Sequence, residues 1–537
     1  MDSSSEPDRR EQVYIPHDPN RIRGDALRRS LRANFLCWIP GAFWMGATAA
    51  LTTTELGKYL GANDLSFALL LTAAPAFAAL FQVVGMVVTE HLGARKTFFL
   101  WMVSSHRLLY CVIGLLPWIV PSQARSSALL MVLIVLVSNS LSQIGAQAWV
   151  NWMADLVPAR VRGKHFAKRG RVGLMVIACT MVAVALLMDW SRTLGFEEVL
   201  KPVSDFAGMP ALIVIISGIF MVAGFVGMFD PLYLLNADEP PMRPPPDEPL
   251  WVRLTKPLTD RPFARFLAYW ALWFAAISFP GWLWWPYLLK ELEQMKAAAN
   301  PSWFARHMYL TATLILGASF QLGQISSYPI WGRAVDRFGR KPIFFISSAF
   351  HTFGWVLWIF LSPSVIPFLF LTQFCSGFCS GGYDIAFFNM QLQFNRRGGA
   401  GYQAVCGAIV NFAGTVSAVV AGCLAHSLEE HNSCYTIFAG TSWEHTFNHY
   451  PLIIAIGMVM KMTADFAVLP RVIDVGGRSR RHALQFVLDN MYGQINTLIF
   501  EPIKTGVELT GKGLTGVKET LSDSLSDAGD EIRRWWQ

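Results

Sequence analysis

The sequence has little charge for its length and no set of cysteines that could staple a small extracellular domain. Asp, Glu, Lys and Arg make up 15% of the 537 residues, whereas ordinary globular chains contain about 25%. Seven of the eight cysteines fall inside apolar runs, where Cys acts as a small hydrophobic residue. Cys375 and Cys379 are four residues apart, but no His or further Cys completes a metal set beside them. We therefore exclude a disulfide scaffold and expect no metal site.

Sequence features of enzymes are also missing. No Gly–x–x–x–x–Gly–Lys–Ser loop is present to hold nucleotide phosphates, and no nucleophile, base and orienting residue cluster along the chain. We therefore expect no enzymatic activity and no cofactor. The net charge of +7 could indicate a nucleic-acid partner. Basic residues that orient membrane helices explain this charge better, so we expect no nucleic acid.

Long apolar runs are what the chain has in abundance, with 53% hydrophobic residues. About 20 apolar residues cross a bilayer as a helix, because every backbone group must form its hydrogen bond inside the segment. The sequence therefore predicts an all-α membrane protein with twelve transmembrane helices. The runs cover 33–56, 65–89, 97–119, 126–151, 172–190, 210–235, 263–288, 307–331, 343–361, 364–390, 403–425 and 448–470.

The loops between these runs differ in basic charge, which predicts the orientation. Five alternate loops together hold 18 Lys and Arg, and the six loops on the other side hold 7. Because basic loops stay in the cytoplasm, both termini are expected there. The charged segment 1–32 lacks the apolar core of a signal peptide and is expected to be a cytoplasmic tail. We expect a multi-pass protein of a bacterial inner membrane.

A proline-rich segment, 236–262, divides the chain into two parts with six runs each, 33–235 and 263–470. The six prolines from Pro240 to Pro249, among charged residues, cannot form a continuous helix, so we expect an exposed cytoplasmic linker. The two parts repeat each other. Gly93-Ala94-Arg95-Lys96 follows the second run, and Gly339-Arg340-Lys341 follows the eighth. An internal repeat of six helices is typical of transporters.

The segment Gly332-Arg333-Ala334-Val335-Asp336-Arg337-Phe338-Gly339-Arg340-Lys341 carries the clearest motif. It resembles the Gly–x–x–x–Asp–Arg–x–Gly–Arg–Lys loop of the major facilitator superfamily, and Asp155 to Lys164 resembles another loop of that superfamily. The resemblance implies a cytoplasmic gate. In that gate, Gly332 allows two helices to approach closely, Asp336 fixes the closed state and Gly339 forms the turn. The gate residues expected are Gly332, Asp336, Arg337, Gly339, Arg340, Lys341, Glu90, Gly93 and Arg95.

The resemblance also implies that the first, fourth, seventh and tenth helices line a central cavity. An amide side chain inside a span is costly unless it is hydrogen-bonded or hydrated. Such side chains therefore either line a water-filled cavity or join two helices by a hydrogen bond. Two tryptophans of the seventh run could stack on a ligand or pack against other helices. The side chains expected at the cavity are Asn139, Gln143, Gln147, Asn151, Gln321, Gln324, Gln373, Trp270 and Trp273.

Acidic residues inside spans are rarer, and Asp384 lies on a predicted cavity helix after a glycine-rich stretch. A carboxylate in a low-dielectric cavity can bind a proton reversibly, so we expect Asp384 to couple transport to a proton gradient, with Glu55 as second candidate. A salt bridge is the alternative for Asp384. Lys461 and Asp465, four residues apart on the twelfth run, are expected to form a structural ion pair.

The last segment, 471–537, has apolar residues at helical spacing among charged ones. We expect amphipathic helices that bind the inner leaflet or a partner protein. The function expected from all these features is secondary transport of a small solute by alternating access. The alternative is a non-transporting assembly factor or scaffold subunit with the same fold.

Overall fold

The computed structural model describes residues 22–242, 249–398, 400–431, 435–437, 445–472 and 484–485. These residues are almost entirely helical, and the predicted all-α architecture is confirmed, with one short hairpin of strands β1 (Tyr435–Ile437) and β2 (His445–Phe447) as the exception. The amphipathic tail predicted for 471–537 lies almost wholly outside the described residues.

Two compact units can be separated by their internal contacts, and each is described here by itself. The first contains the described residues of 1–61, 77–180 and 197–248. Its helices are α1 (Gly24–Leu36), α2 (Trp38–Ala47), α3 (Ala50–Leu60), α6 (Phe81–Leu92), α7 (Arg95–Ile119), α8 (Arg125–Leu156), most of α9 (Ala159–Trp190), most of α10 (Leu194–Ala207), α11 (Ala211–Gly227) and α12 (Phe229–Tyr233).

The second unit contains 62–76, 181–196 and the described residues from 249 onward. Two stretches from the first six predicted spans therefore pack with the last six. Its first helices are α4 (Asp64–Ala68), a π-helical turn at Leu69–Ala73, α13 (Leu250–Thr259), α14 (Arg261–Gly281), α15 (Trp284–Lys296), α16 (Trp303–Arg306) and α17 (Met308–Thr313). The rest are α18 (Phe320–Phe338), α19 (Arg340–Phe353), α20 (Val356–Ile359), α21 (Ile366–Gly398), α22 (Ala400–Glu430) and α23 (His449–Thr463); α5 (Ala74–Ala78) lies at the boundary between the units.

Nine of the described helical segments are long and apolar enough to cross a membrane. A tenth is counted if Gly24–Ala47 and Ala50–Leu60, which are bent by 43° to each other, form one broken span. The eighth predicted span corresponds to α17, the π-helical segment Leu314–Ser319 and the first part of α18, and the tenth corresponds to α21; neither is among the nine. Both α18 and α21 carry amide side chains and an acid, which lower their hydropathy. The chain is a multi-pass membrane protein.

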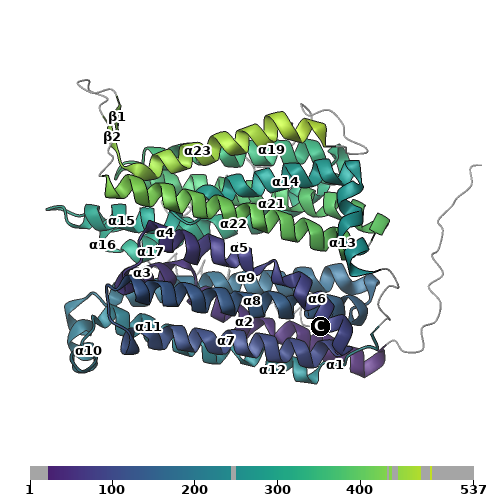
Figure 1. Cartoon of the computed structure of the whole chain (residues 1–537). Coiled ribbons are helices and arrows are strands. Elements are labelled where there is room, and N and C mark those ends of the chain that lie inside the picture. Colours follow the sequence, from purple (N-terminus) through teal and green to yellow (C-terminus); the bar gives the residue numbers. More distant parts are fainter. Residues whose placement is uncertain are drawn as a thin grey trace, which may run out of the picture. The chain divides into compact units, whose positions relative to one another are not determined.

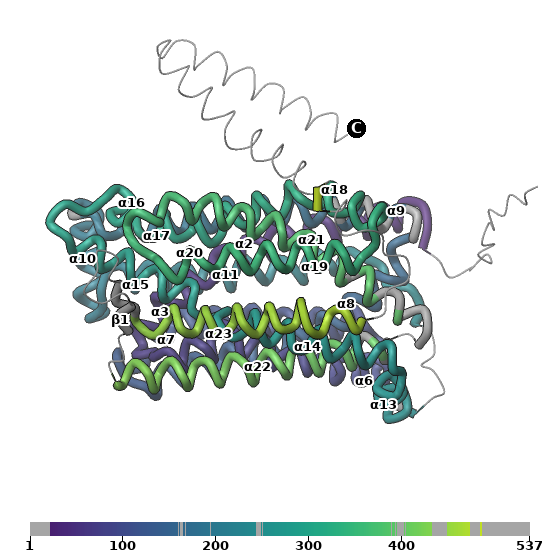
Figure 2. Tube along the Cα trace, turned by 90° about the horizontal axis from the view of Figure 1, so that it is seen from above, coloured from purple at the N-terminus to yellow at the C-terminus, as the bar shows by residue number. Residues whose placement is uncertain are grey.

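Each unit is held by long helices that pack side by side. In the first, α7 packs against α8 and α11, around buried Phe99, Val103 and Trp152. In the second, α14 packs against α22 and α23, and α21 packs against α18 and α19 (Figures 1 and 2). Its core is rich in aromatic side chains such as Phe263 and Phe344, which pack in edge-to-face contacts.

Glycines allow α18 and α21 to approach closely, although Gly332 is not one of them. A Cβ atom at Gly323 would collide with the carbonyl oxygen of Phe374, and one at Gly377 with the carbonyl of Phe320. A Cβ at Gly332 would meet nothing within 4 Å. The expectation that Gly332 brings two helices together is therefore wrong for this conformation, because its face of α18 is open.

The proline-rich linker is less extended than predicted. Residues 250–259 form α13, since the prolines cluster before it and Pro249 occupies its N-cap position, where no backbone donor is needed. At the other end of the linker, Ala237 is buried, and the backbone oxygen of Asp238 accepts a hydrogen bond from the indole of Trp152. The start of the linker is thus part of the first unit.

Candidate functional site

The two motif loops turn on glycines in conformations that other residues rarely adopt. Gly93 ends α6 with a φ of 64°, and Gly339 separates α18 from α19 with a φ of 89°. A side chain at such a φ would be strained, which explains why glycine occupies the turn of each loop. The turn at Gly339 was expected from the motif, and Gly93 makes the equivalent turn in the first unit.

The basic residues after these glycines make the same contacts in each unit. Arg95 donates to the backbone oxygen of Asn151 at 3.2 Å, and Arg340 donates to that of Asn389 at 3.0 Å. The two asparagines hold equivalent positions in the repeat, since each lies twelve residues before a glycine, Gly163 or Gly401. Each arginine therefore contacts the backbone of a neighbouring long helix, α8 in the first unit and α21 in the second.

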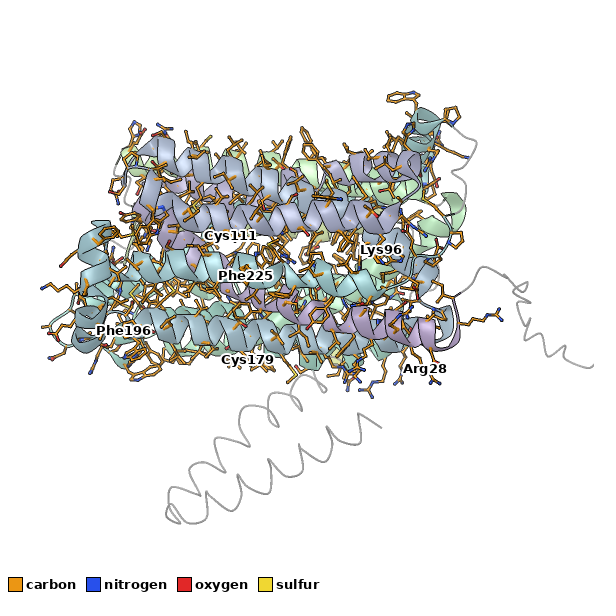
Figure 3. All side chains as sticks on the ribbon, turned by 90° about the horizontal axis from the view of Figure 1, so that it is seen from below. Arg28, Lys96, Cys111, Cys179, Phe196 and Phe225 are labelled. Atoms are coloured by element: carbon orange, nitrogen blue, oxygen red, sulfur yellow. The ribbon has the colours of Figure 1, made fainter. Side chains whose placement is uncertain are left out.

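Lys96 and Lys341 also make equivalent hydrogen bonds. Each donates to backbone oxygens at the point where the last span of its six-span part ends. Lys96 Nζ donates to the backbone oxygens of Leu235 and Ala237, both at 2.8 Å. Lys341 Nζ donates to those of Pro470 and Val472, both also at 2.8 Å. Figure 3 places Lys96 at one end of α7, away from Cys111 further along the helix. The sequence repeat thus extends to individual hydrogen bonds.

Arg95 is buried, with 2% of its side chain exposed, and it carries most of the charge contacts at this end of the first unit. Its guanidinium pairs with Asp155 at 2.5 Å and with Glu239 at 3.4 Å, and it donates to the carbonyl of Pro240 at 2.6 Å. Glu239 also accepts from the backbone N–H groups of Arg95 and Lys96 at the start of α7. This carboxylate therefore neutralises a helix N-terminus as well as a buried cation.

The gate acid Asp336 lies on the exposed side of α18, one turn after Gly332. Among the described residues its carboxylate has no hydrogen-bond or ion-pair partner. Arg337 beside it is also exposed, and its counterpart region in the first unit has a half-buried Glu90. The face that carries Gly332 and Asp336 is therefore accessible in this conformation.

The predicted polar stripe of α8 is half-buried along its length. Gln143 accepts a hydrogen bond from Gln82 of α6 at 2.7 Å, so one member joins two helices. Asn139 donates to the carbonyl of Val135 in its own helix at 2.8 Å. Gln147 has no partner among the described residues, and it is the stripe residue best placed to meet a ligand or water.

Asp384 and Gln324, predicted separately, are brought together in the second unit. Gln324 Nε2 donates to Asp384 Oδ2 at 3.1 Å, which joins α18 to α21. Asp384 is half-buried, and no cation lies against it among the described residues. The salt-bridge alternative for this carboxylate is therefore not favoured. Gln373 is also half-buried, and the side-chain oxygen of Gln321 is buried without a partner.

The two tryptophans of α14 pack inside the second unit. Trp273 is 1% exposed, and its indole donates to Ser348 of α19 at 2.7 Å. Trp270 stacks on Trp273 and on Phe387 of α21, with ring centroids 4.7 and 3.6 Å apart. Of the two alternatives from the sequence, this geometry corresponds to helix packing, because both faces of the Trp270 ring are covered.

Charged residues on the peripheral spans are buried in both units. Arg107 of α7 pairs with Asp230 of α12 at 2.9 Å. Lys461 of α23 does not reach Asp465 directly and instead donates to Thr352 and to the carbonyl of Ser348, both at 2.7 Å. Asp465 accepts from the Ser348 hydroxyl, so this serine links the two charges.

Glu55, the second coupling candidate, already has a cation beside it. Lys58 Nζ lies 2.8 Å from its carboxylate, one turn further along α3. The carboxylate of Glu55 is therefore already paired, whereas no described cation lies beside Asp384. Asp384 is therefore the better candidate for coupling.

Comparison with known proteins agrees with this geometry. The family model described as Major Facilitator Superfamily matches residues 292–464. The solved structure of the nucleoside transporter NupG superimposes with a TM-score of 0.56 at 11% identity, covering 83% of this chain and 99% of that one. The chain has the major facilitator fold. The resemblance inferred from the two motif loops is thereby confirmed.

Other major facilitator structures give the same result. The xylose transporter XylE from E. coli matches with a TM-score of 0.53 at 12% identity, over 85% of this chain and 100% of that one. A D-xylose–proton symporter matches with a TM-score of 0.54 at 14% identity, over 82% and 99%. No curated protein sequence matches this chain significantly. Identities this low show the fold alone.

Two acidic residues with structural contacts, Glu239 and Asp230, were missed in the sequence analysis. Glu239 was assigned to the linker, and Asp230 was not considered. The repeat itself held a signal, since Asp230 and Asp465 are separated by the same 235 residues as Ala237 and Val472. Aligning the two parts residue by residue would therefore have identified Asp230 as the counterpart of Asp465.

Proposed function

We propose that the protein is a secondary active transporter, which moves a small solute by alternating access and is coupled to a proton gradient. The observation that carries the proposal is the half-buried carboxylate of Asp384, which one amide holds and no described cation neutralises. Such an acid can take up and release a proton as water enters and leaves its surroundings. The D-xylose–proton symporter and NupG, which share the fold, are a proton-coupled and a nucleoside transporter by name.

The side chains near this acid favour an uncharged, hydrogen-bonding solute. Gln324 offers its amide at the acid itself, and Gln321 and Gln373 offer amide donors and acceptors on the same two helical spans. Amides satisfy hydroxyl and carbonyl groups without requiring a counter-charge. We place the motif loops and both termini in the cytoplasm of a bacterial cell, on the basis of the basic residues in the loops.

The test is uptake by the purified protein in liposomes. Thermal shift with a panel of sugars, nucleosides and small organic ions would first select ligands. Uptake of the selected solute should be saturable and should exceed equilibrium only when a proton gradient is imposed. A stoichiometric copurifying partner, combined with no saturable uptake of any ligand, would instead favour the scaffold alternative.

Asp336→Asn is expected to bias the transporter toward the state that is open on the motif side. The exposed carboxylate can close that side only by accepting hydrogen bonds as a charged group, and the amide loses this charge. Transport should slow several-fold while the amount of folded, inserted protein stays unchanged. Spin-label distances across the motif side would measure the bias. The exposed acid Glu293 of α15 supplies a matched control, Glu293→Gln, and equal distances in both variants would contradict the gating role.

A further inference from the structure

A short helix, α10, joins the fifth span to the sixth and has an apolar face that is open to the surroundings. Val199, Val203 and Phe206 are 69%, 42% and 87% exposed. Their spacing of four and three residues places them on one side of the helix. An outward apolar face of this kind marks a contact with lipid or with another protein.

The other two sides of α10 differ in character. The four charged residues lie on the side opposite the apolar face and are exposed: Glu197, Glu198, Lys201 and Asp205. The third side is half-buried against the protein and carries Phe196, Leu200, Ser204 and Ala207. Since three of the four charges are negative, attraction to anionic headgroups does not draw the helix to a membrane. Any contact with lipid must come from the apolar face.

The C-terminal end of α10 is fixed to the sixth span. Gly208 adopts a φ of 63°, and the backbone N–H of Met209 donates to the carbonyl of Ser204 at 3.2 Å. This is the Schellman arrangement, which ends a helix at a glycine. The hydroxyl of Ser204 also donates to the backbone oxygen of Met209, whose side chain is 3% exposed. α10 therefore has a set direction relative to the start of α11.

The N-terminal end of α10 is fixed to the fifth span. The rings of Trp190, the last residue of α9, and Phe196 lie with their centroids 4.2 Å apart. The backbone N–H of Phe196 donates to the carbonyl of Thr193 at 3.1 Å, and that of Thr193 to the carbonyl of Trp190 at 2.9 Å. Trp190 is 57% exposed at the end of its span, a position where tryptophan marks the membrane–water interface.

The short links on either side limit how far α10 can lie from the bilayer. Residues 191–193 join it to α9, and residues 208–210 join it to α11. Three residues reach about 11 Å at most, and the headgroup region on each side of the hydrocarbon core is about 5–8 Å thick. Both ends of α10 are thus held at or just above the headgroups. In Figure 1, α10 lies beyond the end of α11 and runs across the direction of the long helices.

α10 lies at the end of the first unit that is remote from its motif loop. It precedes α11, whereas the backbone that follows α11 and α12 accepts hydrogen bonds from Lys96, just after the turn at Gly93. Between these two points the chain forms a candidate span of 26 residues, Ala211–Asn236. α10 and the motif loop of this unit are therefore on opposite sides of the membrane.

We propose that α10 is an interfacial helix, which lies on the bilayer surface opposite this motif loop and inserts Val199, Val203 and Phe206 among the lipids. The bilayer is the occupant that the links dictate, because it is the surface within reach of both ends of the helix. Lipid is already present beside α11, where Val222 and Phe225 are 55% and 63% exposed on a span. The contact does not depend on whether the protein transports a solute.

The experiment measures contact with lipid in the full-length protein. Its native cysteines are replaced, one new cysteine is labelled with an environment-sensitive fluorophore, and the protein is reconstituted in phosphatidylcholine liposomes. Lipids with a nitroxide near the headgroup should quench a fluorophore at Phe206→Cys about threefold or more above one at Lys201→Cys, on the charged side. Aqueous iodide should quench the two in the reverse order. Adding Val203→Asp should lower lipid quenching at Phe206→Cys to the Lys201→Cys level.

A second measurement keeps the native cysteines, so it does not depend on folding of the cysteine-free protein. In lipid nanodiscs, the backbone amides of 197–207 should exchange hydrogen about tenfold faster in Val203→Asp than in the unaltered protein, because insertion no longer protects the helix. Lys201→Ala is the matched control and should leave the exchange unchanged.

Two results would overturn the proposal. The first is exchange that Val203→Asp does not alter. The second is a fluorophore at Phe206→Cys that lipid quenches no more than one at Lys201→Cys. If iodide also reaches the Phe206→Cys fluorophore readily, the apolar face meets water in a pure lipid bilayer. The face would then be a surface for a protein partner and not for lipid.

Discussion

Asp384→Asn is expected to abolish accumulation of solute against a gradient while leaving solute binding intact. The amide resembles the protonated acid in shape and hydrogen bonding, but it cannot release a proton. Gln324 can still contact it, so the join between α18 and α21 should survive. Counterflow exchange in liposomes, which needs no net proton movement, should continue at a rate close to that of the unaltered protein. Accumulation driven by a pH gradient should fall to the background level.

The matched control for this variant is Gln324→Leu, which removes the donor and keeps the carboxyl group. It should retain gradient-driven accumulation but change its dependence on pH, because the charged form of Asp384 loses a hydrogen bond. Accumulation that persists in Asp384→Asn with an unchanged pH profile would remove this residue from the mechanism. Glu55 would then be the acid to examine, despite its ion pair with Lys58.

Asp230→Ala should be among the most destabilising single changes in the first unit. Arg107 and Asp230 are both buried, and the guanidinium also lies 3.8 Å from the centre of the Trp44 ring. Removing the acid leaves a buried cation without its partner, which typically costs about 3–5 kcal/mol. The thermal unfolding temperature of the detergent-solubilised protein should therefore fall by several degrees, and less folded protein should be recovered from the membrane.

A double-mutant cycle separates the pair from its surroundings. Asp230→Asn keeps an acceptor for Arg107, and Arg107→Met keeps most of the side-chain volume without charge. Each alone should destabilise the protein, whereas the two together should recover much of the loss, because no uncompensated charge remains. Destabilisation that is simply additive would show that the two residues do not stabilise the fold as a pair.

Local features of the sequence predicted their structure well. The turn at Gly339 was predicted because a positive φ is readily adopted by glycine itself, and Gly93 turns in the same way. The long apolar runs predicted the helices reliably, because backbone groups inside a bilayer must form their hydrogen bonds within the segment. Asp384 and Gln324 could each be named as polar residues in a span, although only the structure shows that they meet.

Contacts between distant segments could not be predicted. Glu239 lies among prolines and charges, a composition that predicts an exposed linker, and nothing in the sequence shows that it reaches Arg95. Gly332 was expected at a helix contact because the motif resembles a gate, but the packing of one face depends on the conformation. The predicted direct Lys461–Asp465 pair was wrong. The spacing of two residues on one helix says nothing about Ser348 of the neighbouring α19, which contacts both side chains.

Contacts within the two units also differ in when they can form during synthesis of the chain. The partners of Arg95 extend to Pro240, 145 residues later, so the first unit can complete its charge contacts before α14 is made. The buried carboxylate of Asp64 must wait for its partners His449 and Tyr450, 385 and 386 residues further along. Until then its carboxylate has neither of its partners, and the stretch 62–76 is covered only once α14 and α22 have been made. A ribosome that pauses in the second part would therefore leave this segment exposed to chaperones and proteases longer than any other described part of the first six spans.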